Sequence, residues 1–169
     1  AVSREEREQF QLIARRVREA RVYSELVSHR LTADQIRAKN PLALILSGGP
    51  ASVYAEGAPD MDTAVLELGI PTLGICYGMQ LMARDLGGTV ESNDVSEYGK
   101  ADAELGESAL FHDLPPEQVV WMSHRDSVTA PPPGARVTAS SPSTPIAAFE
   151  DADRGLYGVQ FHPEVVHTP

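Results

Sequence analysis

The sequence contains a single cysteine, Cys76, among its 169 residues. One cysteine excludes an internal disulfide framework and a zinc site caged by several thiolates, and it is typical of a reducing compartment. The sequence also lacks an apolar run long enough for a signal-peptide core or a membrane span. We therefore expect a cytoplasmic protein with no membrane partner.

Positive charge is scarce as well. Lys and Arg number 14 against 24 Asp and Glu, which gives a formal net charge of −10 and a pI near 4.9. Because the acidic residues are scattered along the chain, its field repels phosphate backbones and anionic lipids. We predict no nucleic-acid partner. No phosphate-binding loop that ends in Lys-Ser or Lys-Thr is present either, so the chain is not expected to activate an acceptor with ATP.

The composition is that of an ordinary globular protein, with 42% apolar and 22% charged residues. A length of 169 residues suits one compact core. We find no internal repeat, no low-complexity tract and no linker between domains, so we expect one domain over residues 1–169.

The first half of the chain alternates between helical and strand-like patterns. Helices are predicted at about 4–20, from Thr32 to about 40, at about 59–68 and at about 77–86; buried strands are predicted at 42–46 and 71–75, and a β-favouring run covers 23–27. An S-x-x-E capping box at residues 3–6 marks the start of the first helix. This order of strands and helices implies parallel strands with right-handed crossovers.

The pattern of apolar and polar residues changes after Gly88. Short apolar runs at 119–122, 135–139, 145–149 and 156–161 are separated by Pro, Gly, Ser and Asp, which is typical of strands and tight turns. We therefore predict an α/β fold: a mostly parallel central sheet flanked by helices, with a β-rich C-terminal half.

The segment G-I-C-Y-G-M-Q at 74–80 lies where a predicted buried strand meets a predicted helix. G-x-C-x-G in this context is the cysteine form of the nucleophile elbow, in which the flanking glycines make room for a strained turn. The N-terminus of the following helix favours the thiolate of Cys76. The alternative interpretation is a small buried apolar residue, as most single cysteines are.

A second motif, His162-Pro163-Glu164, follows another strand-like run. A cysteine nucleophile needs a base that later acts as an acid, and that base needs a group that fixes its tautomer. A histidine and a glutamate two residues apart in an extended segment supply both groups. A single histidine at a strand end is more often structural, and it is the pairing with Cys76 that favours the catalytic interpretation.

Two further segments follow predicted strands. Ser47-Gly48-Gly49-Pro50 can expose backbone N–H groups to a developing oxyanion, together with the N–H of Tyr77; the alternative is a simple glycine turn. The loop Ser123-His124-Arg125-Asp126 offers polar groups for the charged ends of an amino-acid substrate; the alternative is a solvated turn.

Taken together, these segments resemble the class I glutamine amidotransferases. S-G-G-P, G-I-C-x-G-x-Q and H-P-E occur in that family's order, and the resemblance covers the chain from about Gln11 onward. The forms that these motifs take at residues 74–80, 121–124 and 158–164 are most similar to the motifs of the GMP synthase subgroup. The resemblance implies glutamine hydrolysis to glutamate and ammonia, and a partner ATP pyrophosphatase or synthetase, as a domain or a subunit, that uses the ammonia to convert XMP to GMP.

The resemblance also implies roles for individual residues. Cys76 is the nucleophile, His162 the acid and base, and Glu164 the residue that orients it. The backbone amides of Gly49 and Tyr77 face the oxyanion. The residues implied to place the substrate are Gln80, Ser123, His124 and Asp126. No metal or organic cofactor is implied for this half-reaction, since ATP and Mg²⁺ belong to the partner synthetase.

The start of the chain departs from the family pattern. The family opens with a hydrophobic strand, whereas residues 3–9 here are highly charged, so we expect that strand to be missing or altered and one sheet edge to be unpaired. Two other functions remain open: a cysteine-dependent γ-glutamyl hydrolase or peptidase, and a catalytically inactive regulatory domain of the same fold.

Overall fold

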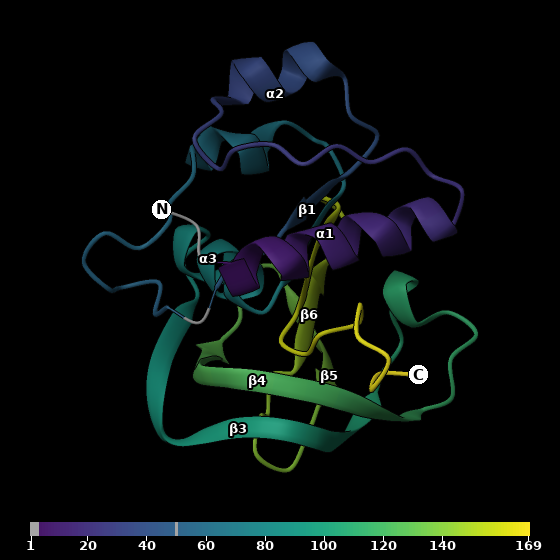
Figure 1. Ribbon diagram of the computed structural model, residues 1–169. Coiled ribbons are helices and arrows are strands. Elements are labelled where there is room, and N and C mark those ends of the chain that lie inside the picture. The colour runs from purple at the N-terminus through teal and green to yellow at the C-terminus, as the bar shows by residue number, and fades with distance from the viewer. Residues whose placement is uncertain (1–3, 50) are drawn as a thin grey trace.

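The computed structural model describes residues 4–49 and 51–169, and in this part of the chain seven strands form one mixed sheet (Figure 1). The strands lie in the order β1-β2-β7-β6-β5-β3-β4. Their bounds are Leu44–Leu46 (β1), Thr72–Ile75 (β2), Thr89–Leu105 (β3), Glu117–Ala130 (β4), Arg136–Ser140 (β5), Ala148–Asp151 (β6) and Leu156–Val159 (β7). The β-rich C-terminal half is confirmed.

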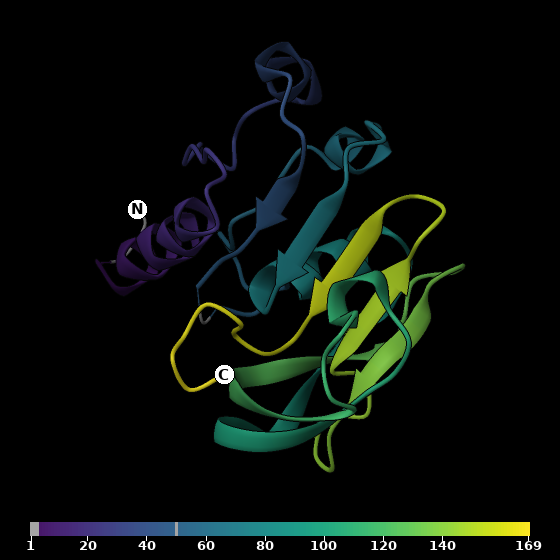
Figure 2. The same ribbon diagram turned by 90° about the vertical axis from the view of Figure 1, so that its right-hand side faces the viewer.

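The prediction of a mostly parallel sheet is wrong. β1, β2 and β7 run parallel, with Leu46, Gly74 and Gly158 in register, and every other neighbouring pair is antiparallel. Antiparallel strands need only short turns, whereas parallel strands need crossovers. In the described part of the chain, no further α-helix follows the one at Tyr77–Asp85, and β3, β4, β5, β6 and β7 each pair antiparallel with at least one of the others, so the parallel part is confined to three strands (Figure 2).

The helices fall partly where the sequence predicts them. The first predicted helix is confirmed as α1 (Arg4–Glu19), and the second as α2 (Ala33–Lys39), which starts with a Thr32–Gln35 capping box. The helix predicted at 77–86 is α3 (Tyr77–Asp85). The helix predicted at 59–68 is only the 3₁₀ turn η1 (Thr63–Glu67), and a second 3₁₀ turn is η2 (Ala109–Phe111). The capping box predicted at 3–6 begins at Ser3, which lies outside the described residues.

Two predictions near the start of the sheet are wrong. The run 23–27 pairs with no described strand and its side chains are largely exposed. The run 42–46 contains the strand β1, but this strand is not buried: Ile45 is 41% exposed, and Leu42, just before it, is 89% exposed. The reason is position, since β1 is the end strand of the sheet and has a described neighbour on one side only.

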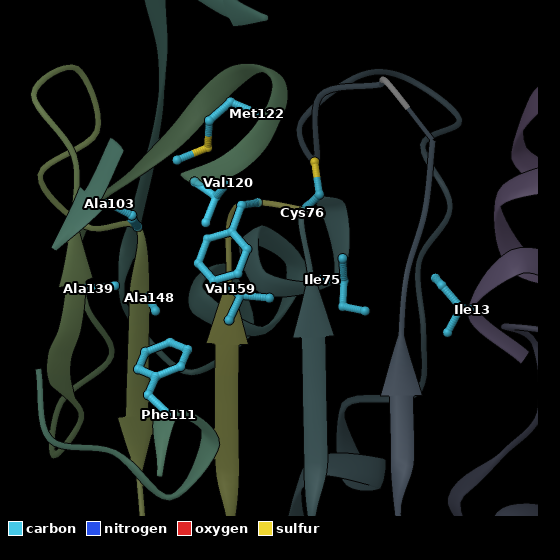
Figure 3. Close-up of a cluster of buried hydrophobic side chains, with 12 residues drawn as sticks. Ile13, Ile75, Cys76, Ala103, Phe111, Val120, Met122, Ala139, Ala148 and Val159 are labelled. Atoms are coloured by element: carbon cyan, nitrogen blue, oxygen red, sulfur yellow. The ribbon is translucent and has the colours of Figure 1, made fainter. Parts of the chain in front are cut away.

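One of the two main buried clusters lies against the middle of the sheet (Figure 3). Ile75 and Val159, at the ends of β2 and β7, pack with Val120 and Met122 of β4, and Ile13 of α1 joins them from the far side of β1. This packing brings α1, the ends of the parallel strands and the long β4 strand together in one place. Within the residues that the structure describes, no helix combines the length and hydrophobicity that crossing a bilayer requires.

Candidate active site

Cys76 lies in the sharp turn between β2 and α3, as the G-x-C-x-G spacing predicts. Its backbone has φ 51° and ψ −106°, a strained conformation for a residue with a side chain. The flanking glycines allow the turn: a methyl group on Gly74 would lie 2.7 Å from the carbonyl oxygen of Gly78, and one on Gly78 would overlap the carbonyl of Leu46. The sulfur therefore projects beyond the end of β2 (Figure 3).

His162 and Glu164 lie beside this turn and contact each other. Nδ1 of His162 is 2.9 Å from Oε1 of Glu164, and both side chains are buried. Nδ1 is thus occupied, and Nε2 is the ring nitrogen left to interact with Cys76. Burial opposes the imidazolium, but the hydrogen bonds to Cys76 and Glu164 outweigh it and raise the pKa of His162 to about 10. Burial also opposes the charge of Glu164, yet His162 holds the pKa of this carboxyl below its ordinary value.

The backbone of His162 is fixed by the last residues of the chain. Its N–H donates to the carbonyl of Trp121 at 3.0 Å, and its own carbonyl accepts from the hydroxyl of Thr168 at 2.8 Å. The same hydroxyl accepts from the N–H of Trp121 at 3.0 Å, and the ring of His167 packs on the Trp121 indole. The histidine is therefore attached to β4 from two sides.

Helix α1 contributes side chains that the sequence analysis did not identify. The amide nitrogen of Gln9 lies 3.0 Å from Nδ1 of His162 and 3.3 Å from Oε1 of Glu164. Nε of Arg16 donates to the carbonyl of Glu164 at 2.9 Å. No local sequence signal points to these residues, because more than 140 positions separate them from their partners in the chain.

The glycine loop after β1 approaches α3, as expected for the predicted oxyanion site. A methyl group on Gly48 would lie 2.7 Å from Cγ of Tyr77, so the loop and the first residue of α3 are in close contact. A methyl group on Gly49 would overlap the carboxylate of Glu6, so this side chain of α1 lies directly against Gly49. The loop that carries Gly49 thus contacts Tyr77 through Gly48, and an acidic side chain lies beside Gly49.

The predicted substrate loop lies within β4 and faces Cys76 with its backbone. Sγ of Cys76 is 3.6 Å from the carbonyl oxygen of Ser123. The ring of His124 is buried: Nδ1 is 3.0 Å from the carbonyl of Asp126, and Nε2 is 3.3 Å from the carboxylate of Glu97. Burial lowers the pKa of His124, and the carbonyl of Asp126 and the carboxylate of Glu97 oppose this shift.

Gln80 lies beneath this loop, on α3. Its side chain is 3% exposed, and its amide nitrogen donates to the carbonyl of Asp126 and to the side chain of Gln160. Gln160 is fully buried and in turn contacts Sγ of Cys76 at 3.5 Å. The sequence analysis missed Gln160, which stands two residues before His162 in the segment that follows β7.

Among the described residues, no three His, Cys, Asp or Glu side chains gather closely enough to hold a metal ion. What the structure brings together is a strained cysteine, a histidine with a strongly raised pKa, and a carboxylate that orients it. This set of groups suits nucleophilic attack on a carbonyl carbon through a covalent intermediate.

The family model for class I glutamine amidotransferases matches residues 7–169. The chain belongs to this family. A solved structure with a similar fold is a putative GMP synthase subunit from Thermoplasma acidophilum, with a TM-score of 0.83 and 29% identity over 93% of this chain and 79% of that one. A glutamine amidotransferase of Thermotoga maritima shares the fold, with a TM-score of 0.70 and 24% identity over 91% of this chain and 70% of that one.

Among curated proteins, the similar relatives are longer enzymes. The chain is 59% identical over 159 residues to the glutamine-hydrolysing GMP synthase of Mycobacterium bovis, and 60% identical to that of Parafrankia sp.. These matches cover 94% of this chain and 30% of each relative. The chain thus spans less than a third of the curated relatives that it matches.

Proposed function

We propose that this chain hydrolyses glutamine to glutamate and ammonia through a thioester on Cys76, and that the ammonia serves the conversion of XMP to GMP by a synthetase domain or subunit. One observation carries the catalytic part: Cys76 stands in a strained elbow, its interaction with the ring of His162 raises the pKa of that ring, and Glu164 holds Nδ1 of the same ring. The names of the similar relatives support the GMP part.

The raised pKa of His162 sets the protonation state at the start of the reaction. With a pKa of about 10, the ring is protonated at neutral pH while it faces Cys76. The nucleophile in this proposal is the thiolate form of Cys76, which the neighbouring imidazolium stabilises. The thiolate attacks the side-chain amide carbon of glutamine, and the carbonyl oxygen becomes an oxyanion. The N–H groups of Gly49 and Tyr77 are proposed to stabilise this charge.

The tetrahedral intermediate collapses when the carbon–nitrogen bond breaks. His162 gives its proton to the departing nitrogen, ammonia leaves, and a γ-glutamyl thioester remains. The neutral ring then takes a proton from water, and the hydroxide formed attacks the thioester. Glutamate leaves, and the thiolate and imidazolium are restored. Glu164 keeps Nδ1 protonated throughout, so that Nε2 carries the exchangeable proton.

The test measures glutamate release from glutamine by the chain alone, with a GMP-synthase-type ATP pyrophosphatase, and with that partner plus ATP and XMP. We expect slow hydrolysis by the chain alone and acceleration in the complete mixture, because ammonia made without an acceptor is lost. Cys76→Ala should abolish the activity in all three. Activity that survives this substitution contradicts the nucleophile assignment, and preference for γ-glutamyl peptides over glutamine identifies a γ-glutamyl hydrolase instead.

A further inference from the structure

Three buried groups connect the loop at residues 123–126 to the sulfur of Cys76. The carbonyl oxygen of Asp126 accepts a hydrogen bond from Nε2 of Gln80 at 2.7 Å. The same nitrogen donates to Oε1 of Gln160 at 3.1 Å. Nε2 of Gln160 then lies 3.5 Å from Sγ of Cys76. We call these groups the amide relay: Asp126 carbonyl, Gln80, Gln160 and Cys76.

The orientation of both amides in the relay follows from hydrogen-bond chemistry. A backbone carbonyl can only accept, so the end of Gln80 that faces Asp126 must be its NH₂ group. That group has two hydrogens, and the second one points to Gln160, whose facing atom must therefore be the oxygen. The NH₂ group of Gln160 is left to face Cys76. One carbonyl thus determines that a donor, and not an acceptor, lies against the sulfur.

The other groups around the sulfur have different preferences. The carbonyl of Ser123, 3.6 Å from Sγ, can accept from a thiol but repels a thiolate. His162, oriented by Glu164, favours the thiolate as an imidazolium. The ring of His124 is turned toward Glu97 and Asp126. Gln160 is thus a neutral hydrogen-bond donor that stabilises the thiolate and offsets the repulsion from the Ser123 carbonyl. Because Gln160 is fully buried, water does not screen this interaction.

We propose that Gln160 is a further catalytic residue, whose amide stabilises the Cys76 thiolate, and that Gln80 is a positioning residue that aims it. This inference rests on the proposed function, in which the thiolate is the nucleophile. It gives Gln80 a role different from contact with the substrate. It also means that the loop that carries Ser123 and Asp126 affects the sulfur by two routes, through the Ser123 carbonyl and through the relay.

The experiment measures the rate of alkylation of Cys76 by iodoacetamide as a function of pH, since only the thiolate reacts quickly. Cys76 is the only cysteine, so the label reports one site. We compare the wild type with Gln160→Met and Gln80→Met, which keep the side-chain length and remove the donor. The matched control is Gln118→Met, a partly buried glutamine of the same sheet that lies outside the relay.

In Gln160→Met the midpoint of alkylation should move up by about one pH unit, the effect expected when a hydrogen bond to a charged group is lost. In Gln80→Met it should move in the same direction by less, and in Gln118→Met it should stay in place. A folded Gln160→Met protein with the wild-type midpoint overturns the proposal. A wild-type midpoint in Gln80→Met overturns the positioning role.

A measurement on the wild type covers the case in which Gln160→Met does not fold. The side-chain amide protons of Gln160 should shift in ¹H–¹⁵N NMR spectra with the same pH midpoint as alkylation, and alkylation should abolish that shift. Amide protons that do not respond to pH overturn the proposal. The proposed function fails separately, if alkylated wild-type protein or Cys76→Ala still hydrolyses glutamine.

Discussion

The side-chain nitrogen of Gln9 lies 3.0 Å from Nδ1 of His162 and 3.3 Å from Oε1 of Glu164, so a helix at the start of the chain contacts both members of the pair near its end. The amide donates to the same carboxylate oxygen that holds the histidine. A second donor on this oxygen stabilises the carboxylate charge and fixes its position. The geometry of the His162–Glu164 pair thus depends on α1.

We therefore predict that Gln9→Leu lowers kcat for glutamine hydrolysis about tenfold, the value of one hydrogen bond to a charged group. KM should change little, because Gln9 contacts the catalytic pair. Steady-state kinetics tests this. Gln11→Leu, an exposed glutamine on the same helix, is the control and should retain wild-type kinetics. Equal kcat values for the two variants would contradict the role of Gln9.

For Glu6 we predict that a substitution raises activity instead of lowering it. Its carboxylate lies against Gly49, beside the N–H groups proposed to stabilise the oxyanion. A fixed negative charge there disfavours a second negative charge in the transition state. Glu6→Gln should therefore raise kcat/KM several-fold, with a smaller effect in high salt if the charge is partly screened. Glu8→Gln, which removes an exposed charge paired with Arg4, should leave kcat/KM unchanged. A lower kcat/KM in Glu6→Gln would show that this carboxylate supports the site.

The local parts of the site are the parts that the sequence predicts well. G-x-C-x-G identifies the elbow because the steric need for Gly74 and Gly78 arises within five residues of chain. His162 and Glu164 are found for the same reason, since they stand only two residues apart; the structure brings them together in a turn after β7, and not in the extended segment that we expected. Contacts from Gln9 to His162 cross 153 positions, and no short-range pattern encodes them.

The errors in the fold have a similar origin. An apolar run such as 42–46 indicates a strand, but whether the strand lies at the centre or the edge depends on the order of all the strands. The direction of β5, β6, β3 and β4 is likewise a property of the connections, which the apolar periodicity does not contain. The run 23–27 has β-forming residues, but no described strand pairs with it.

The raised pKa of His162 predicts how stability depends on pH. Because its pKa of about 10 in the folded protein exceeds the unfolded value near 6.5, the folded state binds this proton more tightly. This stabilisation is complete below about pH 6.5 and is lost as the pH rises through about 10. Glu164, with a lowered pKa, stabilises above its ordinary value near 4.3 and loses the effect as the pH falls through the lowered value.

Urea unfolding at pH 7 and pH 10.5 tests this. The free energy of unfolding should fall more over this interval in the wild type than in His162→Asn, which has no group that titrates at this position. Cys76→Ala removes one of the hydrogen bonds that raise the pKa of His162, so NMR titration of the ring should show a lower midpoint in this variant. An unchanged midpoint would mean that Glu164 alone accounts for the shift.

The last prediction concerns the elbow itself, and it separates steric from chemical requirements. A methyl group on Gly78 would overlap the carbonyl of Leu46 in β1, which is backbone and cannot rotate away. Gly78→Ala must therefore push α3 from β1, at a cost of about 2–3 kcal/mol in unfolding free energy. The displacement also moves Tyr77 and Cys76, so glutamine hydrolysis should fall in the protein that remains folded.

Gly106→Ala is the control for Gly78→Ala. Its methyl group would meet its nearest atom, the carbonyl oxygen of Thr138, at 3.4 Å, which is an ordinary contact. Thermal and urea unfolding of both variants gives the comparison. If Gly78→Ala is as stable as Gly106→Ala, then β1 and α3 are not held at so close a separation, and the elbow has room for a side chain at this position.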